Sequence, residues 1–421
     1  MDDIWIDDRL HLRREIEHWD NAINRMRDID SRWSPIALNS LEHYLGLSIR
    51  KRLLEAVDRL EKSSRELYLQ YGKIQEPNEY NLLRRQLLNL RRQYSRTETT
   101  LDFYADALNT RSNEYMGQLM SACDALARKS MFEALSPLRR ETPHVLTFID
   151  KGLGASILKM GLRLWDGGTI NPVAVIKVVY HNLMRPTSLI HEAGHQVAHI
   201  LNWNAELAHC IRQSLLSYSI ELADIWSSWA SEIAADAFAF VYTGYAAVAS
   251  LHDVLSLQRG FVFRFIPGDP HPISYLRVLL GIMMCQQTYG AGAWDSLQIS
   301  WLKRYPHSSA PRELRQILQD SLTVLPTICR IILCQPMDAF NGRSIVELVD
   351  PMRVHPNALH HWEQEMGASL YQSSYWISNH ALRLLALSGY KVAVEPQYMT
   401  RILRQQEAWM LKLGIRTETI H

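Results

Sequence analysis

The spacing of apolar residues in the first 140 positions restricts the fold of this chain more than any other feature. Such residues recur at alternating intervals of four and three along residues 53–71 and again along residues 83–108. This spacing places apolar side chains on one face of a helix and is typical of two helices packed along a shared seam. Gly72 and Pro77 bound the gap between the two runs and favour a turn there. The predicted seam residues are Leu53, Val57, Leu60, Ser64, Leu67 and Tyr71, followed by Leu83, Leu87, Leu90, Tyr94, Thr97, Leu101, Tyr104 and Leu108.

The sequence therefore predicts a long helical, coiled-coil-like domain over residues 1–140. A hairpin of this kind can serve the fold alone, by packing on its own chain. It can also act as an arm that docks a protein partner or a second copy of the chain. Spacing alone does not distinguish these roles, and both remain open.

Beyond this domain the pattern changes to one short strand among helices. Residues Val145–Trp165 have a helix-like pattern, residues 166–168 favour a turn, and the β-branched run Val173–Tyr180 predicts a strand. Further helices are expected at about residues 187–201, 212–250, 273–288, 311–334, 357–388 and 397–413. The expected fold class is mainly α (α+β), with one small sheet and a helical C-terminal region, residues 296–421, that packs on the core.

Composition argues against several classes of partner. Lys and Arg number 45 and Asp and Glu 44, so no overall field attracts nucleic acid or an anionic membrane. The long charge-free runs, such as Ala237–Leu251 and Val278–Trp294, fall short of the ~20 apolar residues that a spanning helix needs. The N-terminus lacks the apolar segment of a signal peptide. The five cysteines are scattered, without a Cys-x-x-Cys pair, which fits a reducing compartment. We expect a soluble cytoplasmic protein, or an effector delivered by a specialised secretion system.

The motif HEAGH, which begins at His191, carries the main chemical signal. On a helix, His191 and His195 project from one face one turn apart, so both imidazoles can reach one metal ion. Glu192 lies beside them, where its carboxylate can take a proton from water bound to zinc, which lowers the pKa of that water to about 7. A metzincin would continue with Gly and His where this chain has Ala198 and Leu201, so that class is excluded. The motif is short, and a third ligand is needed to support it.

The best third ligand lies in the segment Ser231–Asp236. Glu232 and Asp236 stand one turn apart on an apolar helix, where acids are costly unless they are paired or bind a metal. Glu232 would complete the metal site, and Asp236 could accept the free N–H of a ligating histidine and orient its ring. The alternatives are a solvated acidic stripe, or Glu221 as the third ligand.

A third element, DPHPISYLR, runs from Asp269 to Arg277. Its prolines predict a rigid loop that enters a helix, with His271 in the loop and Arg277 inside the helix. An imidazole or a guanidinium there could stabilise the oxyanion that forms during amide hydrolysis. Taken alone, the segment is an ordinary helix start.

The order of these three motifs resembles the gluzincin metallopeptidases that include HtpX and the CaaX prenyl proteases. The matching elements are HEAGH at 191–195, EIAAD at 232–236 and HPISYLR at 271–277, about a fifth of the chain. The resemblance implies a zincin-like core at residues 141–295 and one zinc ion per chain. It implies three ligands (His191, His195 and Glu232), a base (Glu192), a supporting acid (Asp236) and two residues of the active-site wall (His271 and Arg277).

These relatives are often embedded in membranes, so a prenylated or membrane substrate does not carry over to this chain. The strand Val173–Tyr180 stands where zincins pair an edge strand with an extended substrate. We therefore expect a zinc metallopeptidase that acts on a peptide or protein. Two alternatives remain: a zinc hydrolase for a non-peptide amide, and a helical scaffold in which a structural zinc, closed by a fourth protein ligand, only stabilises the fold.

Overall fold

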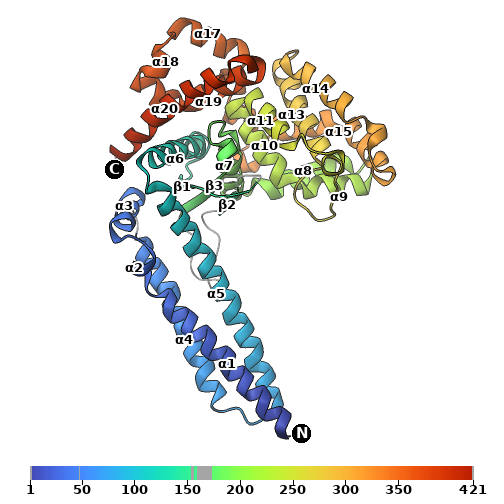
Figure 1. Ribbon diagram of the computed structural model, residues 1–421. Helices are drawn as coiled ribbons and strands as arrows, with labels where there is room; N and C mark the ends of the chain where they lie inside the picture. The colour runs from blue at the N-terminus through green and yellow to red at the C-terminus, as the bar shows by residue number, and fades with distance from the viewer. Residues whose placement is uncertain (1, 47, 153–155, 159–172, 420–421) are drawn as a thin grey trace. The chain divides into compact units, whose positions relative to one another are not determined.

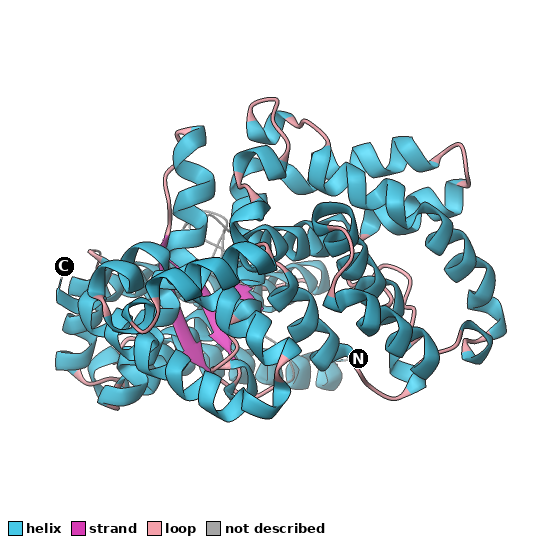
Figure 2. Ribbon diagram, turned by 90° about the horizontal axis from the view of Figure 1, so that it is seen from above, coloured by secondary structure: helices cyan, strands magenta, loops and turns pink. Residues whose placement is uncertain are grey.

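The computed structural model describes residues 2–46, 48–152, 156–158 and 173–419. These residues are mainly helical with one three-stranded sheet, as the sequence predicted (Figure 2). Its described residues form two compact units, one up to Asn113 and the other from Glu114 onward.

The described residues of the first unit form five helices, labelled in Figure 1: α1 (Asp2–Met26), α2 (Ile29–Arg32), α3 (Pro35–Leu45), α4 (Ile49–Tyr71) and α5 (Pro77–Arg111). Helices α4 and α5 pack against each other, and α1 packs against both. The predicted helical hairpin is confirmed, because the chain leaves α4 at Tyr71 and enters α5 at Pro77.

The seam of the hairpin is buried as the spacing indicated. All predicted seam residues except the half-buried Tyr71 are buried. The polar Ser64 fits into this seam because its hydroxyl donates a hydrogen bond to Asp20 of α1, at 2.8 Å. A buried hydroxyl is tolerated where it has such a partner.

The second unit contains the sheet, in the order β1-β3-β2. Strand β3 (Val173–Val178) runs parallel to β1 (His144–Ile149) and antiparallel to β2 (Ser156–Leu158). The strand predicted from Val173 is confirmed. The helix-like reading of Val145–Trp165 is wrong over its described residues, because a short buried strand and a buried helix segment both appear as apolar runs. Residues 159–165 and the predicted turn at 166–168 lie outside the described residues.

The position of β3 also differs from the expectation. It is the central strand and not an edge strand, so its backbone is paired on both sides. The outer side of β1 is covered by α6 (Glu114–Leu135), where Asp124 accepts hydrogen bonds from the Thr147 backbone N–H at 2.7 Å and from the Thr147 hydroxyl at 2.8 Å. Among the described residues, β2 is the other outer strand of the sheet.

Helices make up the rest of the second unit, and Figure 1 labels most of them. They are α7 (Thr187–Leu201), α8 (Trp203–Leu215), α9 (Ile220–Ser228), α10 (Ala230–Thr243), α11 (Tyr245–Leu255), α12 (Arg259–Val262), α13 (Ser274–Tyr289), α14 (Ala293–Arg304), α15 (Arg315–Cys334), α16 (Ile345–Leu348), α17 (Pro356–Met366), α18 (Ser369–Gln372), α19 (Ser374–Val394) and α20 (Met399–Thr419).

Several predicted helices are divided further. The single helix expected at 212–250 is wrong, because the chain breaks at Ser219, which caps α9, and at Gly244, whose φ of 57° separates α10 from α11. Such a φ favours glycine.

Two further differences concern α14 and α6. Helix α14 was not expected. Helix α6, which we grouped with the N-terminal domain, packs against α7, β1 and α20.

One described helix, Arg312–Cys334, has the length and composition of a membrane-spanning helix, and half of its most apolar stretch is buried within the protein. Core helices pass the same test, so this is weak evidence, and the expected absence of a spanning segment stays a prediction.

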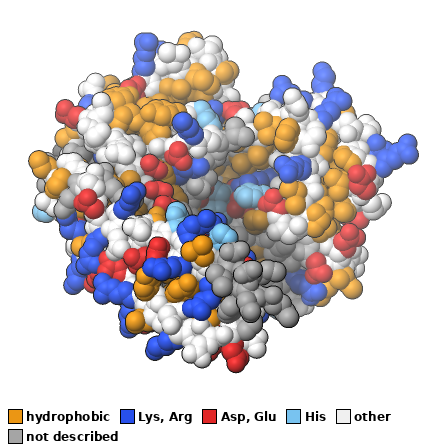
Figure 3. Space-filling model, turned by 60° about the horizontal axis from the view of Figure 1, so that its bottom comes forward, with side chains coloured by type: hydrophobic (Ala, Val, Ile, Leu, Met, Phe, Trp, Pro, Cys, Tyr) orange, Lys and Arg blue, Asp and Glu red, His pale blue; other side chains and the backbone are white. Residues whose placement is uncertain are grey.

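On the face drawn in Figure 3, Lys and Arg side chains are interspersed with Asp and Glu.

Candidate metal centre

The site is built where helices α7 and α10 approach each other closely. Gly194 faces α10, and a Cβ atom at this position would lie 2.8 Å from Phe238 Cβ and 3.1 Å from Ala235 Cα. A side chain at position 194 would push the two helices apart. The small residues Gly194 and Ala235 thus bring the histidines of α7 within reach of the acids of α10.

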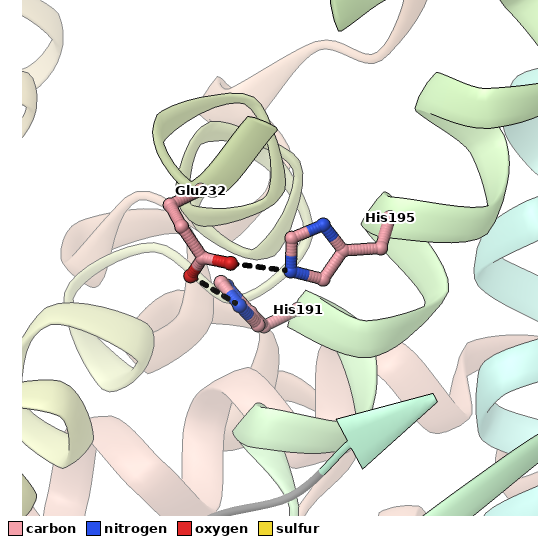
Figure 4. A group of neighbouring side chains, drawn as sticks. All are labelled: His191, His195 and Glu232. Atoms are coloured by element: carbon pink, nitrogen blue, oxygen red, sulfur yellow. Dashed lines mark ion pairs between the residues drawn. The ribbon is translucent and has the colours of Figure 1, made fainter. Parts of the chain in front are cut away.

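Three side chains converge across this contact (Figure 4). His191 and His195 come from α7, and Glu232 comes from α10. Glu232 Oε2 lies 3.5 Å from His191 Nε2, and Glu232 Oε1 lies 3.2 Å from His195 Nε2. One ligand atom from each residue lies within 4.8 Å of the others, so the group could hold a metal ion.

Asp236, one turn beyond Glu232, supports the His191 side of the group. Its Oδ1 lies 2.9 Å from His191 Nδ1. When Asp236 accepts a hydrogen bond from Nδ1–H, the tautomer is fixed and Nε2 is left free for a metal. Arg277 in turn holds Asp236 with two hydrogen bonds of 2.6 and 2.8 Å, and lies 3.1 Å from Glu232 Oε2.

Electrostatic coupling in this network is strong. Burial alone lowers the pKa of His191, but hydrogen bonds to Asp236 and Glu232 outweigh burial and raise the pKa to about 10. Burial raises the pKa of Asp236, but the charge of Arg277 and the bond from His191 lower it to about 2. The pKa of Glu232 also falls, and that of Arg277 rises, because their partners outweigh burial. A metal cation would replace the proton shared between His191 and the acids, so acid should weaken metal binding.

At its Nδ1 atom, His195 has a neutral partner, whereas Nδ1 of His191 faces a carboxylate. The Ser231 hydroxyl lies 3.3 Å from His195 Nδ1, and the Asn204 side-chain amide of α8 donates to the same hydroxyl at 3.3 Å. Sequence reasoning missed the roles of Ser231 and Asn204. The adjacency of Ser231 to Glu232 was visible, but Asn204 reaches the site only through the packing of α8 on α10.

Glu192 and His271 line the same cavity as the three candidate ligands. Glu192 is buried, and its carboxylate interacts electrostatically with Arg277. The ring of His271 is 60% exposed, with Nε2 at 3.7 Å from Glu232 Oε1 and Nδ1 at 2.7 Å from Asp269 Oδ1. Asp269 thus orients the ring with its other nitrogen toward the candidate metal ligands.

The cavity has a volume of about 530 Å³, within the range of small-molecule sites. Residues of β2, α7, α10, α11 and α13 surround it. A buried acid, a candidate metal group and room for a ligand thus meet in one place.

The structure brings together every site residue that the sequence proposed. One difference concerns Arg277, whose guanidinium is engaged by Asp236 and Glu232, whereas we assigned it to an oxyanion. Glu221, the alternative ligand, is exposed on α9 and lies outside the candidate metal group.

Comparison with known proteins finds no family model that matches the chain, and no curated protein or solved structure with significant similarity to it. The functional argument therefore depends on the geometry of this site.

Proposed function

We propose that the protein is a zinc-dependent hydrolase that cleaves peptide bonds. The observation that carries this proposal is the convergence of His191, His195 and Glu232 in a cavity that Glu192 also lines. Two imidazole nitrogens and one carboxylate oxygen form a ligand set that catalytic zinc uses, with the fourth position left for water or substrate. When bound, zinc would supply a Lewis acid that polarises the carbonyl group and promotes ionisation of water.

Glu192 is the proposed general acid–base. It is adjacent to His191 on α7 but is not among the three candidate ligands, so its carboxylate is free to accept a proton. It would take a proton from the attacking water and return it to the leaving amine. Because Glu192 is buried, few water molecules compete for this transfer.

His271 and Arg277 have different proposed roles. His271 presents Nε2 beside Glu232 and is largely exposed, so it can donate a hydrogen bond to the oxyanion of a bound substrate. Arg277 positions Asp236 and Glu232 through its two ion pairs. This role fits a buried guanidinium, since a buried charge needs fixed partners.

A peptide substrate is favoured by strand β2. Ser156 and Ile157 of this outer strand line the cavity, and an extended peptide can add to the edge of a sheet through its backbone. The order of the three motifs, which resembles that of gluzincins, points to the same substrate class.

One observation favours the scaffold alternative. His271 Nε2, at 3.7 Å from Glu232 Oε1, could move to become a fourth protein ligand and close the site. A closed four-ligand site is structural. In that case His271→Ala would weaken zinc binding, whereas in the hydrolase it would lower only the rate.

The test compares Glu192→Gln with the wild-type protein on a broad peptide library, with zinc content and melting temperature measured in the same samples. Loss of the acid–base group should lower the cleavage rate by about 10²–10⁴-fold, while zinc content stays unchanged. Glu221→Gln, at an exposed acid outside the site, is the matched control and should cleave like the wild type. Equal cleavage by Glu192→Gln and the wild type would contradict the mechanism.

A further inference from the structure

The cavity continues from the candidate metal ligands into an apolar chamber. One face of α11 forms a wall, with Leu251, Val254 and Leu255 at helical spacing. Helix α13 forms another wall through Leu280 and Met284. Helices α11 and α13 pack against each other and against α10, which carries Glu232.

The surface of α11 in this chamber is incompletely covered. Leu251, Val254 and Leu255 remain partly exposed, whereas Leu280 and Met284 across the chamber are buried. Partly exposed apolar residues at three positions on one helix face can be covered by an apolar ligand group. The same cavity contains the proposed reaction centre, so the group that covers them would belong to the substrate.

Charge is unevenly distributed along the cavity. All the charged or titratable residues that line it belong to the group around the candidate metal site: His191, Glu192, His195, Glu232, Asp236, His271 and Arg277. Among the described lining residues of α11 and α13 beyond Arg277, none carries a charge. A charged substrate side chain would lose its hydration in the chamber without gaining a partner, whereas an apolar one would lose nothing.

The walls of the chamber are fixed by specific contacts. Gly281 lies against Val248, where a Cβ atom would be 3.1 Å from the Val248 side chain, so α13 and α11 meet closely at this position. Arg185 ties the segment before α7 to α11, with an ion pair to Asp253 of 2.6 Å and a hydrogen bond to the Ser250 hydroxyl of 3.3 Å. A preformed chamber can discriminate between side chains by size and polarity.

We propose that this chamber is a specificity pocket that takes one large uncharged side chain, such as Leu, Met or Phe, next to the bond that is cleaved. The proposal rests on the proposed hydrolase function and deepens it by naming the substrate class. Leu251 is the residue whose substitution tests it best, because it lines the chamber and is partly exposed.

The experiment digests a proteome-derived peptide library with the zinc-loaded full chain and determines the cleavage sites by mass spectrometry. On one side of the cleaved bond, Leu, Met and Phe should exceed Asp and Glu by at least about 10-fold, since a single methylene in an apolar pocket changes specificity by about 10–200-fold. Leu251→Asp should reduce this preference about 10-fold. Leu257→Asp, at a leucine that is 44% exposed and outside the cavity, should leave it unchanged.

A second variant keeps the test informative if Leu251→Asp does not fold. Leu251→Phe keeps the wall apolar but takes up space, so it should shift the preference from Phe toward Val and Ala. A wild-type enzyme that cleaves without preference for apolar residues would overturn the proposal, as would a folded Leu251→Asp variant with the wild-type preference.

A binding measurement separates failure of this proposal from failure of the proposed function. If no peptide is cleaved, zinc-loaded protein is incubated with the same library and the retained peptides are identified. Retention of Leu-, Met- and Phe-containing peptides that is lost in Leu251→Asp would support the pocket even though the hydrolase proposal had failed. Retention without apolar preference, or no retention, would overturn the pocket.

Discussion

Two helix pairs in this protein are held together in different ways. Helices α4 and α5 meet along an apolar seam that repeats for several turns, so many similar contacts share the stabilisation. Helices α7 and α10 meet at Gly194 and bring four titratable side chains into one network, which Arg277 of α13 joins. A substitution in the first pair should therefore change stability through the apolar surface it removes, and not through the loss of one particular partner. The second depends on a few positions, each with its own partner.

The largest effect on stability is expected in the hairpin. Leu90→Ala removes a buried side chain from the seam and should lower the free energy of unfolding by about 2–5 kcal/mol. Leu88→Ala, on the same helix but 46% exposed, is the matched control and should change it by less than about 0.5 kcal/mol. Zinc affinity should be unchanged in both variants. Loss of zinc in Leu90→Ala would show that the two pairs are coupled. Denaturant unfolding and zinc titration measure both quantities.

A smaller loss of stability, but a direct effect on the metal site, is expected at the second pair. Gly194→Ala would place a Cβ atom 2.8 Å from Phe238 Cβ, so α7 and α10 must separate. The cost of such overpacking is about 1–3 kcal/mol, and zinc affinity should fall as well. Gly260→Ala, where a Cβ meets no atom within 4 Å, is the control and should behave like the wild type. Unchanged zinc affinity in Gly194→Ala would show that the close approach does not matter to the site.

This comparison also shows why only part of the molecule could be predicted from sequence. The hairpin seam and helix α7 follow from local periodicity, which one helix displays by itself. The strand at Val145 was read as a helix because burial on all sides removes the alternation that identifies strands. The close contact at Gly194 and the partnership of Ser231 with Asn204 arise between elements, so no local pattern reveals them. The three motifs predicted which residues meet and that Asp236 would support a histidine, but not that Arg277 would pair with Asp236 and Glu232.

The two histidines provide the finest comparison, since one is supported by a carboxylate and the other by a hydroxyl. Asp236→Asn should weaken zinc binding by about 10–100-fold, because His191 loses a charged partner. Ser231→Ala removes a neutral hydrogen bond worth about 0.5–1.5 kcal/mol, so affinity should fall by about 10-fold or less. Competition with a chelator gives both affinities. If Ser231→Ala weakened zinc binding more than Asp236→Asn does, the support of His195 by Ser231 would matter more than the support of His191 by Asp236, contrary to this account.

The most direct test of the account is the content and coordination of zinc in the purified protein. Elemental analysis should find one zinc per chain, and X-ray absorption should show nitrogen and oxygen ligands at about 2.0–2.2 Å without sulfur. Glu232→Ala should lose the metal, while Glu221→Ala should keep it. Stoichiometric zinc in Glu232→Ala, or a sulfur ligand in the wild type, would contradict the assignment of His191, His195 and Glu232 as the metal centre.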